Sequence, residues 1–131
     1  MNASARFASA LGLAAILTAG ATIAQAPTIK RTILQRVDIG NNMEAVLGMA
    51  EIAPGGSTGP HTHFGIETGY ILAGTGTLVI EGEPTRTLKP GDSYLIPAGK
   101  VHDAKANGPE PSKVLATYVV EKGKPLATPA K

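Results

Sequence analysis

The sequence has no cysteine and no tryptophan, and aromatic residues make up only 4% of its 131 positions. Without cysteine the chain can form neither a disulfide nor a lipid-modified thiol, so the folded protein depends on its core for stability. Few aromatic side chains argue against stacking platforms for single-stranded nucleic acid or for large planar ligands. Beyond position 26 the aromatic residues are Phe64, Tyr70, Tyr94 and Tyr118.

A block of charge of one sign is also absent. Twelve lysines and arginines face ten acidic residues, which gives a formal net charge of +2. We therefore expect no nucleic-acid partner and no polybasic membrane patch. A chain of this length has room for one domain and not for two.

Residues 1–26 differ from the remainder of the chain and are typical of a signal peptide. An arginine precedes an apolar run rich in alanine and glycine, which ends in the small-x-small triplet Ala24-Gln25-Ala26. A retained membrane anchor is the alternative, since about 18 apolar residues can just span a bilayer. We expect cleavage, after Ala26, Ala24 or Ala21, and a secreted or periplasmic protein with no stable membrane association. No arginine pair precedes the run, so we expect any metal to be acquired outside the cytoplasm.

From residue 27 onward, short runs rich in β-branched and aliphatic residues alternate with glycine and proline. This pattern predicts an antiparallel all-β sandwich or barrel over residues 27–121. Residues 122–131 contain two prolines and three lysines, and we expect them to form a flexible C-terminal tail. The expected strands are 31–39, 44–52, 61–64, 67–73, 76–81, 85–88, 93–97, 102–105 and 114–121.

The chain has three histidines, and they fall in two segments punctuated by glycine. In an extended strand alternate side chains share a face, so His61 and His63 point the same way. Glu67 has the same parity, and a turn or bulge at Gly65 would bring its carboxylate to the same point. His102 follows a Pro-x-Gly turn 35 residues after Glu67, where a facing strand would present it to the same site.

Three imidazoles and one carboxylate suit a single divalent first-row metal ion, which could be Fe, Mn, Ni, Cu or Zn. Four ligands on one side of an octahedral ion leave two positions for water, substrate or dioxygen. The alternative is that these are ordinary polar residues on a strand and a loop. The concentration of every histidine of the chain in two short segments favours the metal site.

The spacing of these residues resembles the two motifs of the cupin superfamily. The first motif matches Gly55, His61, His63, Glu67 and Gly74. The second matches Gly91, Pro97, Gly99 and His102, but Ala106 stands where that motif has asparagine, at a position that we expect in a loop. The resemblance covers about half of the mature chain and identifies it as similar to small single-domain cupins of the cupin-2 type.

This resemblance implies a double-stranded jelly-roll β-barrel that encloses a ligand-sized space. It also implies that His61, His63, Glu67 and His102 are the metal ligands. Cupins include dioxygenases, decarboxylases, sugar isomerases and epimerases, storage proteins and sensory modules, so the fold alone does not decide the function.

Three functions remain open for an exported metal-binding cupin. The first is a metal-dependent oxidoreductase of the dioxygenase type that acts on a small organic acid or phenol. The second is a non-catalytic module that binds metal or a small metabolite. The third, a metal-assisted sugar isomerase or epimerase, ranks lowest because it needs an acid–base pair; inward-facing Glu51 and Tyr94 would supply one. Both have simpler roles, Glu51 as a charge at a strand end and Tyr94 as a packed core residue.

An N-terminal strand at the edge of the barrel, from Thr28 to Val37, is a candidate for edge-to-edge pairing. Unpaired backbone groups on such an edge can accept the same strand of a second copy. We therefore consider a homodimer.

Overall fold

The computed structural model describes residues 28–131, which form two antiparallel β-sheets and no helix. The signal peptide expected at residues 1–26 lies outside the described residues. None of the residues from 28 to 131 belongs to a helix that could cross a membrane. The strands are β1 (Ile29–Gly40), β2 (Met43–Ile52), β3 (His61–Thr62), β4 (Gly65–Ala73), β5 (Gly76–Ile80), β6 (Arg86–Leu88), β7 (Ser93–Ile96), β8 (His102–Ala106), β9 (Ser112–Glu121) and β10 (Thr128–Pro129).

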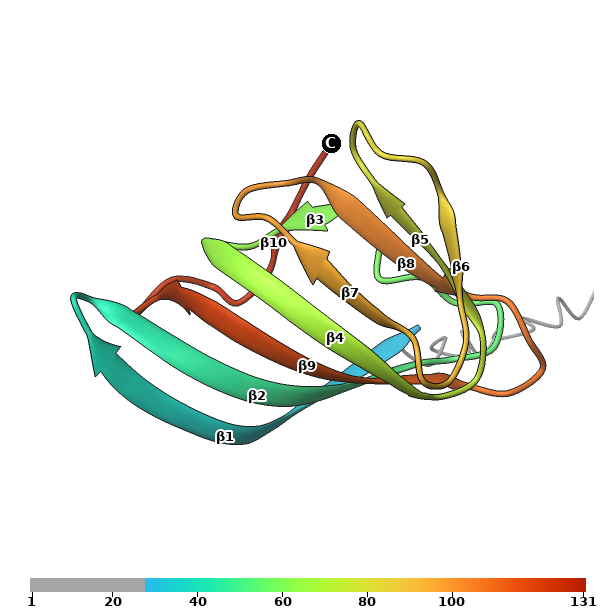
Figure 1. Cartoon of the computed structure of the whole chain (residues 1–131), viewed down its shortest axis with the longest axis horizontal. Helices are drawn as coiled ribbons and strands as arrows, with labels where there is room; N and C mark the ends of the chain where they lie inside the picture. The colour runs from blue at the N-terminus through green and yellow to red at the C-terminus, as the bar shows by residue number, and fades with distance from the viewer. Residues whose placement is uncertain (1–27) are drawn as a thin grey trace, which may run out of the picture.

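The two sheets face each other as the layers of a jelly roll (Figure 1). One sheet has the order β1-β2-β9-β4-β7, and the other has the order β10-β3-β8-β5-β6. The nine strands expected from the sequence are all present, with bounds that differ by a few residues. The all-β jelly-roll prediction is therefore confirmed.

The core lies between the sheets and is built by strand alternation. In β9 every second side chain from Ser112 to Val120 is buried, while the side chains between them are more exposed. The buried apolar residues come from both layers, so closing the sandwich removes both inner faces from water. They include Val46, Ile71, Leu78, Ile80, Leu88, Ile96, Val114, Ala116, Tyr118 and Val120.

The β1–β2 hairpin projects beyond the second sheet (Figure 1). Its turn uses Asn41 and Asn42 with φ of 52° and 59°, left-handed values that asparagine tolerates and that suit a tight two-residue hairpin. β1 is an edge strand, and exposed apolar side chains lie along it at Ile33, Leu34, Val37 and Ile39.

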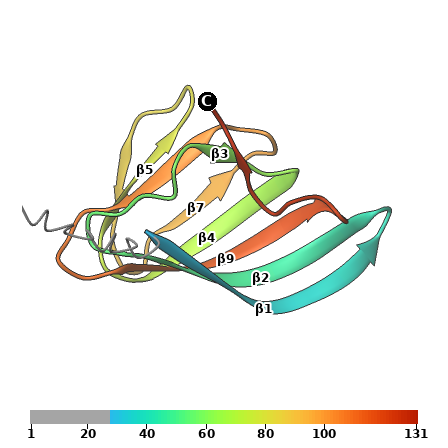
Figure 2. The same cartoon turned by 180° about the vertical axis from the view of Figure 1, so that it is seen from behind.

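The C-terminal segment differs from the flexible tail that the sequence predicts. It leaves β9 and runs across the open side of the sandwich to the other sheet, as Figure 2 shows from behind. There β10 pairs with β3, with Thr128 opposite Thr62 and Pro129 opposite His61. Leu126 packs against the core. The prediction of a flexible tail is therefore corrected. It relied on the lysine and proline content of the segment and overlooked the packing of Leu126 and the short pairing of β10 with β3.

Candidate metal centre

His61 and His102 are brought together by strand pairing. β3 and β8 are antiparallel neighbours, and His61 lies directly opposite His102 in their register. Residues opposite each other in a sheet share a face, so both imidazoles project toward the interior. Their ring centroids are 4.1 Å apart.

The other two side chains approach from the neighbouring turn and the opposite sheet. His63 follows β3, where its carbonyl accepts a hydrogen bond from Gly99 N at 3.1 Å. Its ring centroid lies 5.0 Å from those of His61 and His102. Glu67 lies on the inner face of β4, between Ile96 of β7 and Tyr118 of β9. The site therefore spans the space between the two sheets.

The four side chains converge deep in the sandwich. One ligand atom from each of His61, His63, Glu67 and His102 lies within 4.8 Å of the others. The four residues retain only 6%, 4%, 5% and 4% of their exposure, respectively. Burying four polar groups together is costly unless each is satisfied, so a chain that does so needs a partner at their meeting point.

The hydrogen bonds of the three Nδ1 atoms determine which imidazole nitrogens face the meeting point of the four side chains. Nδ1 of His61 donates to Gly59 O at 2.7 Å, Nδ1 of His102 donates to Lys100 O at 3.0 Å, and Nδ1 of His63 donates to Leu126 O. A carbonyl oxygen only accepts, so each Nδ1 carries the proton and leaves the Nε2 lone pair directed inward.

These lone pairs face a carboxylate. Glu67 Oε2 lies 2.7 Å from His63 Nε2 and 3.3 Å from His102 Nε2. Within residues 28–131, neither Nε2 atom has a hydrogen-bond partner of suitable geometry. Lone pairs this close to a carboxylate oxygen repel it unless a proton or a cation lies between them. The donor set therefore fits a single divalent transition metal ion.

Burial and contacts set the charge state of the metal-free site. Burial lowers the pKa of His61 to about 4, and the other two imidazoles and Arg31 contribute. Burial alone would raise the pKa of Glu67, but the hydrogen bond that the Tyr94 hydroxyl donates lowers it, and a proton or cation held between the carboxylate and Nε2 of His102 or His63 lowers it further. His61 is therefore neutral and Glu67 ionised at neutral pH, which are the forms that bind metal.

These shifts predict that acid destabilises the metal-free protein. Between about pH 6.5 and pH 4, the unfolded chain takes up a proton at His61 that the folded chain does not, so the free energy of unfolding falls as the pH falls. Glu67 acts in the same direction below about pH 4.5. Urea unfolding at pH 7 and pH 4.5 measures the effect. The His61→Gln variant should show a shallower pH dependence, and an unchanged slope would contradict this assignment.

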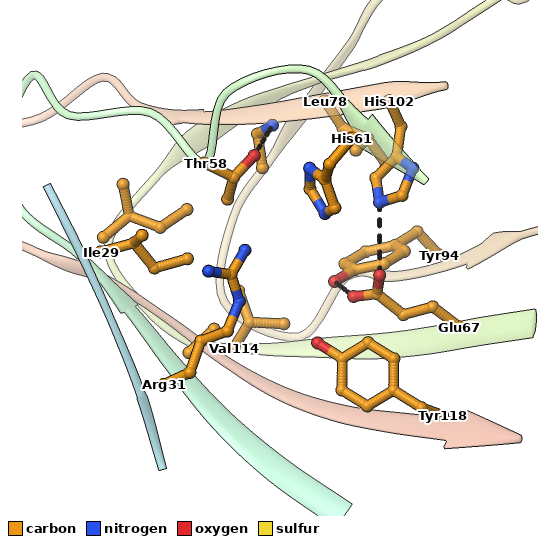
Figure 3. Close-up of a pocket in the computed structure, with 13 residues that line it drawn as sticks. Ile29, Arg31, Thr58, His61, Glu67, Leu78, Tyr94, His102, Val114 and Tyr118 are labelled. Atoms are coloured by element: carbon orange, nitrogen blue, oxygen red, sulfur yellow. Dashed lines mark hydrogen bonds and ion pairs between the residues drawn. The ribbon is translucent and has the colours of Figure 1, made fainter. Parts of the chain in front are cut away.

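Tyr94 holds the second oxygen of Glu67. Its hydroxyl donates to Glu67 Oε1 at 2.6 Å, so the carboxylate turns Oε2 toward the imidazoles (Figure 3). Tyr94 of β7 lies opposite Gly69 of β4, and a Cβ at Gly69 would come within 2.2 Å of the tyrosine ring. Glycine at this position therefore lets the ring lie across β4. The hydroxyl lies in the cavity. From the sequence, a packed core residue is the favoured role for Tyr94, and a hydroxyl in the cavity is the less favoured one.

The Tyr94→Phe variant tests this positioning role. It keeps the ring but removes the hydroxyl that donates to Glu67 Oε1, so we expect metal affinity to fall about 10-fold or more. The pKa of Glu67 should rise, because one of the contacts that lowers it is lost. Competition with a chelator measures affinity. Tyr70→Phe, on an exposed side chain of β4, is the control and should bind metal as the parent does.

The loop before His61 is fastened to β8. Ser57 Oγ and Thr58 Oγ1 both donate to Asp103 Oδ1, at 2.7 and 3.0 Å, and Ala104 N donates to Thr58 Oγ1 at 3.0 Å. These bonds fix where the chain enters β3. They hold the carbonyl of Gly59 in place for His61 Nδ1.

A small cavity adjoins the metal centre. It has a volume of about 30 Å³, and its lining is mostly apolar, with His61, Glu67, Tyr94 and His102 on one side. Figure 3 shows Arg31 reaching into this space from β1. Sequence reasoning missed Arg31, since nothing in the motifs reaches back to the first strand. The feature that could have identified Arg31 is the alternation of side chains along β1, combined with the register between β1 and β2.

The surface role favoured for Glu51 is confirmed, and the loop position expected for Ala106 is corrected. Glu51 does not face inward, because the inner face of β2 carries Val46, Ala50 and Ile52 and not the odd-numbered residues. Its carboxylate instead lies 3.3 Å from Lys113 Nζ. Ala106 is not in a loop: it is the last residue of β8 and is buried. A small apolar side chain suits that core position.

Comparison with known proteins agrees with this geometry. The family model described as a cupin domain, Cupin_2, matches residues 48–118. The chain belongs to the cupin family. Its candidate metal centre lies in the region of the match and contains all three histidines of the chain.

Several cupins of known sequence or structure are similar to this one. The germin-like protein subfamily 2 member 2 of Arabidopsis thaliana is 35% identical over 83 residues, which cover 60% of this chain and 38% of the relative. A cupin-2 domain protein of Rhodospirillum rubrum superposes with a TM-score of 0.65 at 23% identity, covering 80% of this chain and 67% of that one. Recombinant oxalate oxidase in complex with glycolate gives a TM-score of 0.64 at 19% identity, covering 80% and 56%.

These similarities differ in what they establish. The two structural matches fall below 25% identity and support the cupin fold alone. This cupin spans about two fifths of the length of the germin-like relative. The activity of the whole relative therefore does not transfer directly.

Proposed function

We propose that this cupin is an exported, metal-dependent oxidoreductase of the dioxygenase type that acts on a small organic acid or phenol. The observation that carries the proposal is the buried set of three imidazoles and one carboxylate beside a small, mostly apolar cavity. Such a set leaves part of the coordination sphere free for a substrate.

His61, His63, Glu67 and His102 would hold the metal ion. The bound metal would supply Lewis-acid and one-electron chemistry that no side chain of this cavity offers. The backbone carbonyls hold the imidazoles in one tautomer, and Tyr94 holds the carboxylate. Ile52, Leu78 and Val114 give the cavity an apolar lining, which would disfavour water beside a bound substrate.

Glycolate is a small organic acid, and the cupin that binds it in the oxalate oxidase complex has the same fold. This supports an organic acid as the substrate class. The sugar isomerase is disfavoured, because Glu51 lies on the outer face and leaves Tyr94 without an acidic partner other than Glu67.

A non-catalytic binding module is the second candidate. The cavity of about 30 Å³ is small and offers few groups for proton transfer. Zn and Cu bind more tightly than Mn or Fe under the Irving–Williams order, so a chain loaded outside the cytoplasm could hold redox-silent zinc. Zinc would favour binding over catalysis.

Metal analysis of the protein purified from its native compartment separates the two candidates. Oxygen-uptake assays against small organic acids and phenols follow. Iron, manganese or copper together with oxygen uptake would support the oxidoreductase. Zinc with no uptake would contradict it and favour the binding module.

We also propose export to a secreted or periplasmic location and pairing of β1 edges into a homodimer. The free edge of β1 and its exposed Ile33, Leu34, Val37 and Ile39 support pairing. Sedimentation of the mature protein should give the mass of two chains, and the Val37→Lys variant should shift it to one. A monomer at high concentration would contradict the pairing.

A further inference from the structure

Arg31 lies on an edge strand and remains exposed, but its side chain lines the cavity between the two sheets. It stands opposite Ala50 in the β1–β2 register, and Ala50 lines the cavity beside the metal centre. Directly opposite residues share a face. Figure 3 shows the Arg31 side chain extending from β1 with its guanidinium directed into the same space as His61 and Glu67.

The guanidinium of Arg31 has no acidic partner within residues 28–131. The ion pairs of that region instead use Arg36, Lys89, Lys113 and Lys122. Arg36, on the same strand, is bound by both oxygens of Glu44 at 2.9 and 3.1 Å. β1 therefore carries one inward arginine that is neutralised and one that is not.

Arg31 lies where the cavity meets the outside. It lines the inner cavity of about 30 Å³ and also an outer pocket of about 390 Å³, and Thr58 and His61 line both as well. The outer pocket is completed by Pro60 and by residues of the C-terminal segment, Ala127, Pro129 and Ala130. The outer pocket therefore places the guanidinium of Arg31 and the imidazole of His61 beside the same space.

We propose that Arg31 is the anion-binding residue of this cavity, and that the ligand it selects is a small carboxylate. A planar guanidinium presents two parallel donors that match a carboxylate. Size argues against a phenol ring in the inner cavity: an engineered cavity that binds benzene measures about 150 Å³, against about 30 Å³ here. The apolar end of a small carboxylate would lie in the outer pocket of about 390 Å³, which Arg31 also lines. This inference rests on the proposed function, in which the substrate is a small organic acid or a phenol. Of these two classes, the inference favours the acid.

Propionate and propionamide make a matched pair of probes, because they have nearly the same shape and differ in charge. Binding of each to the zinc-loaded protein is followed by chemical-shift titration in NMR spectra, with no turnover required. We expect propionate to bind and propionamide to bind at least tenfold more weakly. Arg31→Gln should weaken propionate binding at least tenfold, since hydrogen bonds between charged groups contribute strongly to binding.

Lys30→Gln is the matched control. It removes one positive charge from the adjacent residue, which faces the other side of β1 opposite Glu51. It should leave propionate binding unchanged, and metal content and urea unfolding should be the same in all three proteins. Equal weakening by both substitutions would mean that net charge and not Arg31 attracts the ligand, and would overturn the proposal.

Two further results would also overturn it: no propionate binding to the parent protein, or binding that Arg31→Gln leaves intact. Sulfate is tested in parallel, and binding as tight as that of propionate would contradict selection for a carboxylate. The outcome is separable from the oxidoreductase proposal, because zinc-loaded protein consumes no oxygen. Propionate binding that depends on Arg31, without any turnover by iron-loaded or copper-loaded protein, would support this inference and contradict the oxidoreductase proposal.

Discussion

Replacing His61, His63 and His102 together by alanine abolishes metal retention while the β fold survives. The three imidazoles supply three of the four donors, and a single carboxylate holds a divalent ion weakly. The fold survives because strand pairing and the apolar core do not depend on these side chains. Metal content after gel filtration and far-UV circular dichroism measure the two expectations.

Single histidine replacements, and a control replacement of an acidic residue on the outer face, test whether the loss of metal is specific to this site. Each single histidine-to-alanine variant should lose metal in competition with a chelator that the parent withstands. Glu51→Ala removes a carboxylate from the surface and should leave metal content unchanged. Unchanged metal stoichiometry in the triple variant would mean that the ion binds elsewhere in the chain.

Ending the chain after Gly123 weakens metal binding about 10- to 100-fold. The deletion removes the Leu126 carbonyl that accepts the proton of His63 Nδ1, and it removes the pairing of β10 with β3 beside His61. Partners that orient a ligating imidazole typically contribute this much to metal affinity. Affinity is measured by chelator competition at pH 7, where His61 is neutral.

Leu126→Ala is the control for the deletion. It removes the side chain that packs on the core but keeps the carbonyl that His63 needs. The free energy of unfolding should therefore fall, by about 1 kcal/mol because Leu126 is only partly buried, while metal affinity stays close to that of the parent. A deletion variant that binds metal as tightly as the parent would show that the C-terminal segment does not position His63.

The cluster of His61, His63, Glu67 and His102 could be predicted from the sequence because its geometry is largely local. Parity places His61, in β3, and His63, just after it, on the same side of the extended chain. The turn before His102 brings the chain back antiparallel to that strand, so the two histidines become direct partners. The nine strand positions follow from the same alternation and from glycine and proline at their ends.

Two kinds of feature could not be predicted from the sequence: which face of a strand packs inside the sandwich, and which strands far apart in the sequence pair with each other. Parity groups Glu51 with Leu47 and Met49, but only the packed sandwich decides that this group faces outward. The inward aim of Arg31 depends on its register with Ala50, and a register shift between Ile33 and Gln35 changes the alternation further along β1. β10 is two residues long and has no pattern to detect.

Arg31 and the C-terminal segment were both missed, and they lie on the same outer pocket. The recognisable motifs supply the candidate ligands, while residues from the two ends of the described chain line the pocket beside them. Motif-based reasoning therefore locates the metal centre but leaves its ligand selectivity open.

The most direct test is anomalous diffraction from crystals of the metal-loaded protein, recorded at the absorption edge of the metal. We predict one strong peak within bonding distance of Nε2 of His61, His63 and His102 and of a carboxylate oxygen of Glu67. A peak away from these four side chains, or one that His102 does not contact, would contradict the shared metal centre on which the proposed chemistry depends.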